Sequence, residues 1–324
     1  MWIDPGSKIL RYPDVLGRIQ QGNRVQPLNV ELDLTNRCNL TCAYCDFAHV
    51  RDSETLNSQA VATILEKLAR ARVRAVTFTG GGEPTVSPLF DGAVCLAFGR
   101  GLRVGVYTNG VKPISAEALE CLDWVYVSLD EPTAAQYQAT KGLDHFETVM
   151  SNIRSMVFGA SVVGVGFLVH ADNAYQIPDM VTLGRSLGAT YTHLRPIVGL
   201  DDYSWVPDVL PLLKTVSTLP DVSAPLGRFE DLWRNQRGLW KRGYTICRGS
   251  ELVPCVGADG TLWVCPNTRG LRSLGNLLAE PFEDIWERRQ RQWVGPDCRI
   301  ACRNHELNRT LDYICQSGQH PEFV

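Results

Sequence analysis

Residues 38–45 read Cys-Asn-Leu-Thr-Cys-Ala-Tyr-Cys and directly follow an apolar run that predicts a β-strand. Three thiolates at this spacing can hold three irons of a four-iron cluster, because soft sulfur ligands suit iron–sulfur chemistry. No fourth cysteine is close to Cys38, Cys42 and Cys45 in the sequence, so one iron is left open for a substrate or cofactor. The alternative from this stretch alone is a structural zinc site completed by His49.

A second motif lies at the end of the next predicted strand, Val73–Phe78. Residues 77–84 read Thr-Phe-Thr-Gly-Gly-Gly-Glu-Pro. Glycines at a strand end let the backbone approach a ligand closely, and a carboxylate such as Glu83 can accept hydrogen bonds from an ammonium group. A glycine triplet alone predicts only a tight turn. It indicates a ligand-binding site here because it follows the cysteine motif.

The two motifs, in this order, resemble those of the radical S-adenosylmethionine (radical SAM) superfamily. The first has the CxxxCxxC spacing with an aromatic residue, Tyr44, before the last cysteine, and the second is similar to the GGEP element. The resemblance implies that the open iron binds the amino and carboxylate groups of S-adenosylmethionine (SAM), and that Gly81, Gly82 and Glu83 hold the methionine amine. It also implies that SAM is cleaved reductively to a 5′-deoxyadenosyl radical, which abstracts a hydrogen from a C–H bond.

Further segments resemble elements of the same family. Residues 107–110, YTNG, are similar to the TNG element, and residues 127–130, VSLD, are similar to the SLD element. Lys141-Gly142 stands where the family often has Arg-Gly, and lysine supplies the charge but not the bidentate fork. Asn173, in the fifth βα unit, is a candidate pocket residue, and the alternative is that its side chain caps its own loop. The resemblance implies a SAM pocket that contains Asn109, Ser128, Asp130, Lys141, Asn173 and Arg195.

β-like runs and amphipathic helical stretches alternate from Val30 to Pro196. The predicted strands are 30–34, 73–78, 103–107, 124–129, 161–169 and 191–195, and the predicted helices are 58–70, 89–98, 116–122, 146–157 and 174–187. Repeated βα units predict a parallel sheet with right-handed crossovers, either an open doubly wound sheet or a partial barrel. The radical SAM resemblance favours a partial (β/α)6 TIM barrel of the α/β class, with its chemistry at the C-terminal strand ends.

The segment 247–324 contains six of the eleven cysteines. Asp259-Gly260 predicts a hairpin turn between two β-like runs, and residues 282–286 lead into a helix. This order resembles the SPASM/twitch extension of radical SAM proteins, which implies a small iron–sulfur domain built from a β-hairpin and a helix. A twitch carries one auxiliary 4Fe–4S cluster, and the expected ligands are Cys247, Cys265, Cys298 and Cys302.

The remaining cysteines have less certain roles. Cys255 and Cys315 could each replace one of the four expected ligands, and a zinc ribbon is the alternative to the cluster. Cys255 is also the candidate catalytic hydrogen donor if the reaction is an epimerisation. Cys95 and Cys121 lie on predicted helices and are expected to be small buried hydrophobic residues.

The chain of 324 residues suits a large domain with a small one. We expect a lead-in over 1–28, the barrel over 29–196, an irregular connector over 197–246 and the auxiliary-cluster domain over 247–324. The formal charge of −3 gives no electrostatic case for a nucleic-acid partner. The sequence contains no signal-peptide core or membrane-spanning run, and its cysteines favour metal or redox use in the cytoplasm.

The substrate is the least determined part of the function. We expect two 4Fe–4S clusters, one that binds SAM and one auxiliary, and an external electron donor such as flavodoxin or ferredoxin. The favoured reaction is dehydrogenation or epimerisation of a sugar-, cyclitol- or nucleoside-like small molecule, as in related twitch enzymes. The alternatives are a maturase of ribosomally made peptides, an enzyme that modifies a nucleobase or nucleic acid, and a non-catalytic zinc scaffold. Maturases often carry an N-terminal recognition domain, for which the short lead-in leaves no room.

Overall fold

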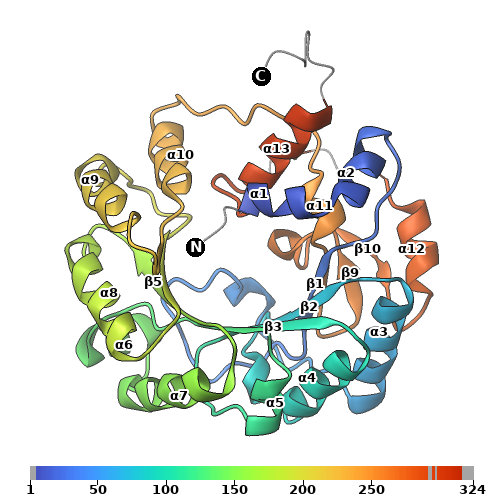
Figure 1. The fold of residues 1–324 in the computed structure, drawn as a ribbon, viewed down its shortest axis with the longest axis horizontal. Helices are drawn as coiled ribbons and strands as arrows, with labels where there is room; N and C mark the ends of the chain where they lie inside the picture. The colour runs from blue at the N-terminus through green and yellow to red at the C-terminus, as the bar shows by residue number, and fades with distance from the viewer. Residues whose placement is uncertain (1–4, 291–293, 296–297, 316–324) are drawn as a thin grey trace.

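The computed structural model describes residues 5–290, 294–295 and 298–315. One curved sheet has the strand order β10-β9-β8-β1-β2-β3-β4-β5-β6-β7, and helices α3 to α9 lie along its convex side (Figure 1). The strands are β1 Asn29–Asp33, β2 Ala75–Thr79, β3 Arg103–Thr108, β4 Trp124–Val127, β5 Val163–Val169, β6 Tyr191–Pro196, β7 Val222–Ser223, β8 Cys255–Val256, β9 Thr261–Trp263 and β10 Ser273–Asn276.

Helices connect the strands and close the sides of the molecule. They are α1 Pro5–Lys8, α2 Pro13–Gln20, α3 Ser58–Arg70, α4 Phe90–Gly99, α5 Ala116–Glu120, α6 Ala134–Lys141, α7 Phe146–Gly159, α8 Ile177–Ser186, α9 Val206–Val216, α10 Leu226–Gln236, α11 Gly249–Leu252, α12 Phe282–Arg288 and α13 His305–Cys315. Strands β1 to β7 pair in parallel with their sequence neighbours. The partial α/β barrel predicted from the sequence is therefore confirmed.

The two faces of the sheet differ in chemistry, as strand β1 shows. Val30 and Leu32 are fully buried in the apolar core, which helix α3 helps to form. Successive side chains of a strand point to opposite faces, so Glu31 and Asp33 point into the barrel. Both carboxylates are nonetheless buried, which requires partners from another part of the chain.

Aromatic rings fill part of the barrel interior, and glycines on neighbouring strands make room for them. A Cβ atom on Gly166 would overlap the hydroxyl group of Tyr126, and one on Gly105 would overlap the ring of Trp124. The ring of Tyr107 lies with its centroid 5.0 Å from those of both Trp124 and Tyr126.

The segment 197–246 is more regular than the sequence suggested. It forms α9, β7 and α10, and β7 extends the barrel by pairing in parallel with β6 at Thr192 and Val222. The expectation of an irregular connector missed this strand because β7 has only two residues, too few to show a periodic pattern.

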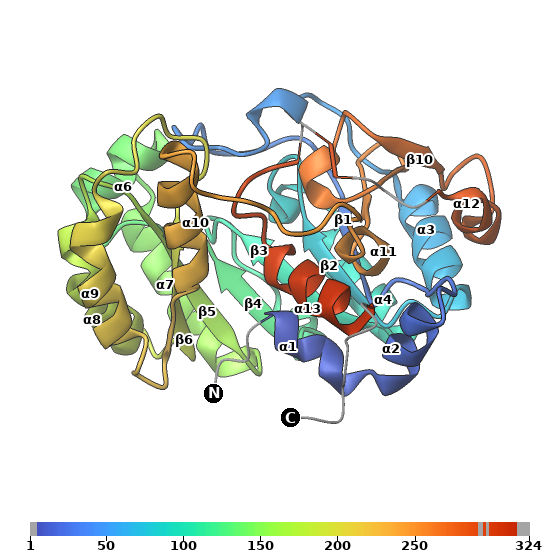
Figure 2. The same cartoon turned by 90° about the horizontal axis from the view of Figure 1, so that it is seen from above.

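The C-terminal segment joins the same sheet. Strands β8 and β9 form the predicted hairpin around Asp259-Gly260, where Gly260 has a φ of 80°. Strand β8 also pairs in parallel with β1, placing Cys255 opposite Glu31. Helix α13 lies beside α1 in both ribbon views (Figures 1 and 2), and its Leu307 and Leu311 pack in a second apolar cluster with the N-terminal helices.

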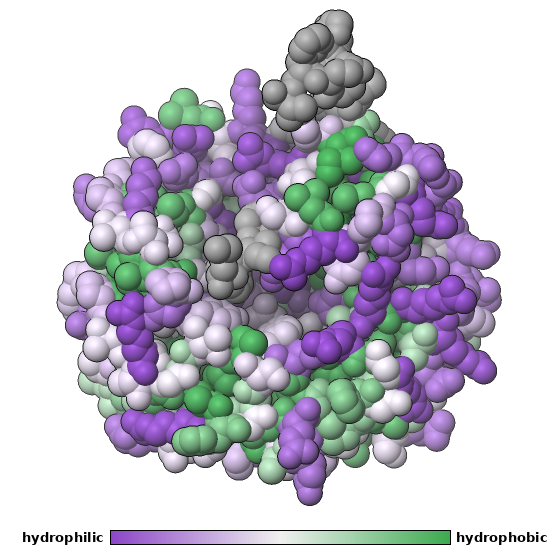
Figure 3. Space-filling view, in the orientation of Figure 1, coloured by the Kyte–Doolittle hydropathy of each residue, from purple (hydrophilic) through white to green (hydrophobic). Residues whose placement is uncertain are grey.

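One face of the surface can be judged by its hydropathy in the orientation of Figure 1. The face shown in Figure 3 is mostly hydrophilic, with apolar residues scattered over it. None of the described helices is both long enough and apolar enough to span a lipid bilayer.

Candidate active site

The first cysteine motif lies on the loop that leaves the C-terminal end of β1. Two backbone bonds fasten this loop to the end of helix α6: Thr41 N donates to Lys141 O at 3.2 Å, and Ala43 N donates to Thr140 O at 2.9 Å. A Cβ atom on Gly142, which has a φ of 81°, would overlap the hydroxyl of Thr41. Lys141-Gly142 therefore positions the cysteine loop as well as supplying a charge.

Nitrogen donors surround the three sulfur atoms. Arg51 donates to Cys45 Sγ at 3.3 Å, and Asn109 Nδ2 lies 4.0 Å from Cys38 Sγ. Burial raises the pKa of the Cys42 thiol, and the nearby Lys141 charge opposes that rise. Iron is held by thiolates rather than thiols, so these cationic and amide donors favour the form that binds metal.

The glycine motif packs directly against the backbone that precedes Cys38. Gly82 N donates to Thr35 O at 3.1 Å, and Glu83 N donates to Arg37 O at 2.8 Å. A Cβ atom on Gly82 would overlap the carbonyl oxygen of Arg37. Glycine is thus required here by close approach of two backbones, and the two motifs form one site.

Glu83 is buried and holds the ends of β2 and β3 together. Its Oε1 accepts from Thr108 Oγ1 at 2.7 Å and from Thr85 N and Oγ1, while its Oε2 accepts from Asn109 N at 2.7 Å. Burial raises the pKa of Glu83, and these donors oppose the rise. Because Oε2 has a single donor, it can accept one more hydrogen bond, such as one from an ammonium group.

Asp130 and Lys141 form a buried ion pair beside the cysteine loop. Lys141 Nζ lies 2.5 Å from Asp130 Oδ2, and both side chains are almost fully buried. Burial alone would lower the pKa of Lys141, but Asp130 and Cys42 outweigh it and raise that pKa. Asp130 Oδ1 is buried without a hydrogen-bond partner among the described residues. Such an orphaned oxygen fits a polar ligand at this place.

The other predicted pocket residues, Ser128, Tyr44 and Asn173, make different kinds of contact. Ser128 is half-buried and its backbone N–H donates to Thr108 O, and the ring of Tyr44 lies 5.5 Å from that of His170. The side chain of Asn173 is used within its own loop, accepting from His170 N at 2.8 Å and donating to Leu168 O at 2.9 Å. These contacts are those of the loop-cap alternative for Asn173.

Polar contacts link the segments that carry the C-terminal cysteines. Burial raises the pKa of the Cys265 thiol to about 11, and the charges of Cys302 and Cys247 add to the rise. Polar groups again face the sulfurs: Asn308 Nδ2 donates to Cys247 Sγ at 3.4 Å, and Asn267 Nδ2 donates to Cys302 Sγ at 3.3 Å. Cys298 is half-buried on the approach to Cys302, and its membership of the ligand set stays a prediction.

Cys255 and Cys315 contact other parts of the chain than the four expected cluster ligands. Cys255 is fully buried on β8 with its thiol 4.0 Å from Asp33 Oδ2, and burial raises the pKa of this thiol well above its usual value. Cys315 Sγ lies 3.9 Å from the carbonyl oxygen of Ile19 in α2. Neither position favours replacement of one of the four expected cluster ligands.

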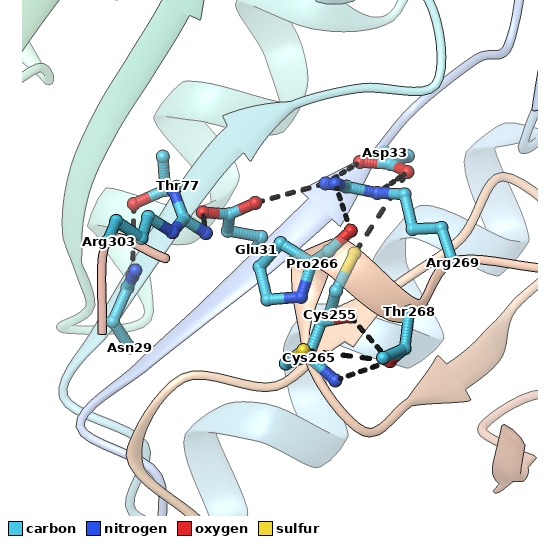
Figure 4. A network of polar contacts seen from close by, with 10 residues as sticks. All are labelled: Asn29, Glu31, Asp33, Thr77, Cys255, Cys265, Pro266, Thr268, Arg269 and Arg303. Carbon is cyan, nitrogen blue, oxygen red and sulfur yellow. Dashed lines mark hydrogen bonds and ion pairs between the residues drawn. The ribbon is translucent and has the colours of Figure 1, made fainter. Parts of the chain in front are cut away.

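A buried ion network joins β1 to the C-terminal segment (Figure 4). The guanidinium of Arg269 binds both oxygens of Asp33, at 2.7 and 2.9 Å, and Oε2 of Glu31 at 3.0 Å. Arg303 binds the other oxygen of Glu31. Arg269 and Arg303 follow Cys265 and Cys302 in the sequence, so the network fixes both cysteine segments to the barrel.

The spacing of the sulfurs bears on the zinc alternative. Zinc binds sulfur at about 2.3 Å in a tetrahedron, which places its sulfur ligands roughly 4 Å apart. Among the described residues no three cysteine sulfurs lie within 4.8 Å of one another; only Asp231, His305 and Glu306 meet that spacing. His49 Nε2 lies 3.4 Å from Arg269 O.

Comparison with known proteins agrees with this arrangement. The radical SAM superfamily model matches residues 32–158. A tungsten-containing aldehyde ferredoxin oxidoreductase cofactor-modifying protein of Pyrococcus furiosus is 30% identical over 335 residues, covering 89% of this chain and 91% of that protein. The chain belongs to the radical SAM superfamily. Members of this family bind SAM on a 4Fe–4S cluster, and those with a SPASM/twitch extension carry a further cluster.

Two other proteins show similarity over most of the chain. Mycofactocin maturase MftC of Mycobacterium tuberculosis is 28% identical over 286 residues, covering 81% of this chain and 70% of the maturase. The crystal structure of Streptococcus suis SuiB bound to the precursor peptide SuiA has a TM-score of 0.66 at 14% identity, covering 88% of this chain and 70% of SuiB. The radical SAM fold thus extends well beyond the residues of the family model.

The Asp130–Lys141 pair gives a first testable prediction. Lys141→Met should weaken SAM binding about 10- to 150-fold, because one charge-assisted hydrogen bond contributes about 1.5–3 kcal/mol. Titration calorimetry with the anaerobically reconstituted protein measures the affinity. Lys141→Arg keeps the charge and should retain most of it, and Lys214→Met, an exposed site on α9, should change nothing. An unchanged SAM affinity in Lys141→Met, with its iron intact, would contradict the assignment.

The C-terminal cysteines give a second prediction. The variant with alanine at Cys247, Cys265, Cys298 and Cys302 should keep about half of the iron and sulfide. It should still form 5′-deoxyadenosine from SAM, because the first cluster carries out that step. Cys255→Ala and Cys315→Ala should keep the full iron content. Loss of the auxiliary iron in either single variant would show that the ligand set is wrong.

Proposed function

We propose that this protein is a radical SAM maturase that modifies a ribosomally made precursor peptide. The observation that carries this proposal is the similarity to a maturase, MftC, over 81% of the chain. The likeness to SuiB, which binds its precursor peptide SuiA on this fold, also supports it. A peptide substrate replaces the sugar-like or cyclitol-like substrate favoured by the sequence alone, which depended on the resemblance of the short C-terminal extension to twitch enzymes.

The proposed roles of the two cysteine sites and of the Asp130–Lys141 pair follow from the geometry of the site. Cys38, Cys42 and Cys45 would hold the SAM cluster, and the Asp130–Lys141 pair would orient SAM on it. Bound SAM supplies the 5′-deoxyadenosyl radical that abstracts a hydrogen from the peptide. The auxiliary cluster, held above the hairpin, would accept the electron that the peptide then loses, and an external donor such as flavodoxin or ferredoxin would reduce the first cluster.

The proposed organisation has a barrel over 29–196 and an auxiliary-cluster domain over 247–324. The parallel pairing of β8 with β1 and the contacts of Arg269 with Glu31 and Asp33 tie these two parts together. The peptide would therefore lie inside the barrel, with the SAM site on one side and the auxiliary cluster on the other.

A second candidate function comes from the Pyrococcus furiosus relative, whose name describes a cofactor-modifying protein. The alignment covers 91% of that protein at 30% identity. A small-molecule cofactor is therefore the alternative substrate class. The two candidates share the radical chemistry and differ in what enters the barrel.

Co-expression distinguishes them. The enzyme is produced with each short peptide encoded beside its gene, and the peptides are analysed by mass spectrometry. One peptide should change in mass, for example by loss of two hydrogens, and remain unchanged beside the variant that lacks Cys38, Cys42 and Cys45. If no peptide changes while a small molecule stimulates formation of 5′-deoxyadenosine, the cofactor-modifying candidate replaces the maturase.

A further inference from the structure

Two arginines of the barrel interior have no acidic ion-pair partner among the described residues, and each lies close enough to the other for their charges to interact. Arg195 comes from β6, with its guanidinium carbon 5.1 Å from the ring centroid of Tyr126. Arg228 comes from the first turn of α10, where its Nε donates to Ala301 O at 2.8 Å. Burial and the charge of Arg195 lower the pKa of Arg228 to about 10. Two guanidiniums thus repel each other in a place where arginines normally have a carboxylate.

The carboxylates of the interior are already engaged. Asp130 is paired with Lys141 through Oδ2. Asp33 is bound by Arg269, and Glu31 is bound by both Arg269 and Arg303. Asp46, which lies near both arginines, is paired with Arg299 at 2.8 Å. Within the described ranges neither Arg195 nor Arg228 takes part in an ion pair, so their charge is left for something that the chain does not provide.

Orphaned polar atoms lie at the same place. Arg195 Nε and the hydroxyl of Tyr126 are buried without a hydrogen-bond partner in the described part of the chain. Buried polar groups are nearly always hydrogen-bonded. Arg195 and Arg228 as whole residues are half-buried, so neither residue is sealed completely inside the core.

The position of the pair is as informative as its charge. Arg195 lies close enough to Asp130 for their charges to interact, at the SAM end of the interior. Arg228 donates to the carbonyl oxygen of Ala301, the residue before Cys302, and so lies at the auxiliary end. An anion that contacts both arginines would lie between the two cysteine sites. A substrate at that position could lose a hydrogen at the SAM site and an electron to the auxiliary cluster.

We propose that Arg195 and Arg228 bind a carboxylate of the substrate and fix its reactive carbon between the two clusters. This proposal rests on the peptide maturase function, and the carboxylate is either the C-terminus of the peptide or an Asp or Glu side chain. We assign the carboxylate of SAM to other cations, because Arg51, which donates to Cys45 Sγ at 3.3 Å, and Lys141, whose charge acts on Cys42, both lie beside the first cysteine motif. This gives Arg195 a substrate-binding role in place of the SAM-binding role that the sequence implied.

Calorimetry with the reconstituted, SAM-loaded enzyme under anaerobic conditions tests the proposal without knowledge of the natural substrate. The probes are N-acetyl-Ala-Ala with a free carboxylate, the same dipeptide as its amide, N-acetyl-aspartate methylamide and hexanoate. One of the carboxylate peptides should bind at least about tenfold more tightly than the amide, and which one binds identifies the source of the carboxylate. Equal binding of the carboxylates and the amide overturns the proposal.

Matched variants locate the site. Arg195→Gln and Arg228→Gln should each abolish the preference for the carboxylate and leave iron content and SAM affinity unchanged. Arg195→Lys and Arg228→Lys should retain part of it, and Arg154→Gln, exposed on α7, should retain all of it. If Arg195→Gln instead weakens SAM binding, or Arg228→Gln alters only the auxiliary cluster, the proposal is overturned.

The outcome for hexanoate separates this inference from the peptide function. Hexanoate carries the same carboxylate without a peptide bond. If it binds as tightly as the dipeptide and the variants abolish its binding, the arginines recognise a carboxylate and the support for a peptide substrate is lost. If only the peptides bind, both proposals are supported. The wild-type comparison of acid with amide decides the main question even if a variant fails to fold.

Discussion

Replacing Cys38, Cys42 and Cys45 with alanine should abolish the formation of 5′-deoxyadenosine and remove about half of the iron. Two four-iron clusters contain about eight irons, so the variant should retain about four irons and four sulfides. The physical reason is that SAM cleavage needs an electron delivered to SAM bound on the open iron, and alanine provides no ligand for that cluster. Dithionite-driven cleavage by the reconstituted protein, followed by chromatography, measures the loss.

A matched control uses two cysteines outside the barrel. The thiols of Cys95 and Cys121 lie 3.6 Å apart between α4 and the end of α5. The double alanine variant should keep all of the iron and the full rate of SAM cleavage. Stoichiometric zinc without iron in the wild-type protein, or unchanged SAM cleavage in the triple variant, would contradict the assignment of the first cluster.

Arg269→Gln should lower the free energy of unfolding by about 3–5 kcal/mol. Arg269 neutralises Asp33 and Glu31 in the barrel interior, and removal of one partner of a buried pair leaves an uncompensated charge. Burial already raises the pKa of Asp33 even with Arg269 present. Urea denaturation of the reconstituted protein, followed by circular dichroism, measures the change.

Two further variants control for the general loss of an arginine. Arg309 forms an exposed pair with Glu306, so Arg309→Gln should change the free energy of unfolding by less than about 1 kcal/mol. Adding Asp33→Asn to Arg269→Gln should restore part of the lost stability, because the unpaired charge is then absent. Equal denaturation midpoints for Arg269→Gln and Arg309→Gln would show that the network contributes little.

The parts of the site that depend on local sequence could be predicted. The cysteine and glycine motifs each lie within a few residues of a strand end, and parallel strands bring those ends to one edge. The resemblance singled out Asp130 and Lys141, which form a buried ion pair in the structure, while their SAM-binding role stays a prediction. Asn173 was also expected in the pocket, but the structure shows its amide closing a turn, which a polar residue after a strand does equally often.

The long-range contacts could not be predicted in the same way. Arg269 lies 236 residues from Asp33, and Arg303 lies 272 residues from Glu31. A local pattern carries no information about such partners. The one available signal was the alternation of Glu31 and Asp33 with apolar residues in β1, since two carboxylates inside a buried strand require cations from elsewhere.

The shared sheet has a consequence for how the protein folds. Strand β8 pairs with β1, and Arg269 and Arg303 neutralise the carboxylates of β1. A chain that ends at residue 246 would leave Glu31 and Asp33 without these arginines and β1 with an open edge. The hydrogen-bonded sheet therefore couples the two cysteine sites into one cooperative unit, which should melt in a single transition rather than as two independent modules.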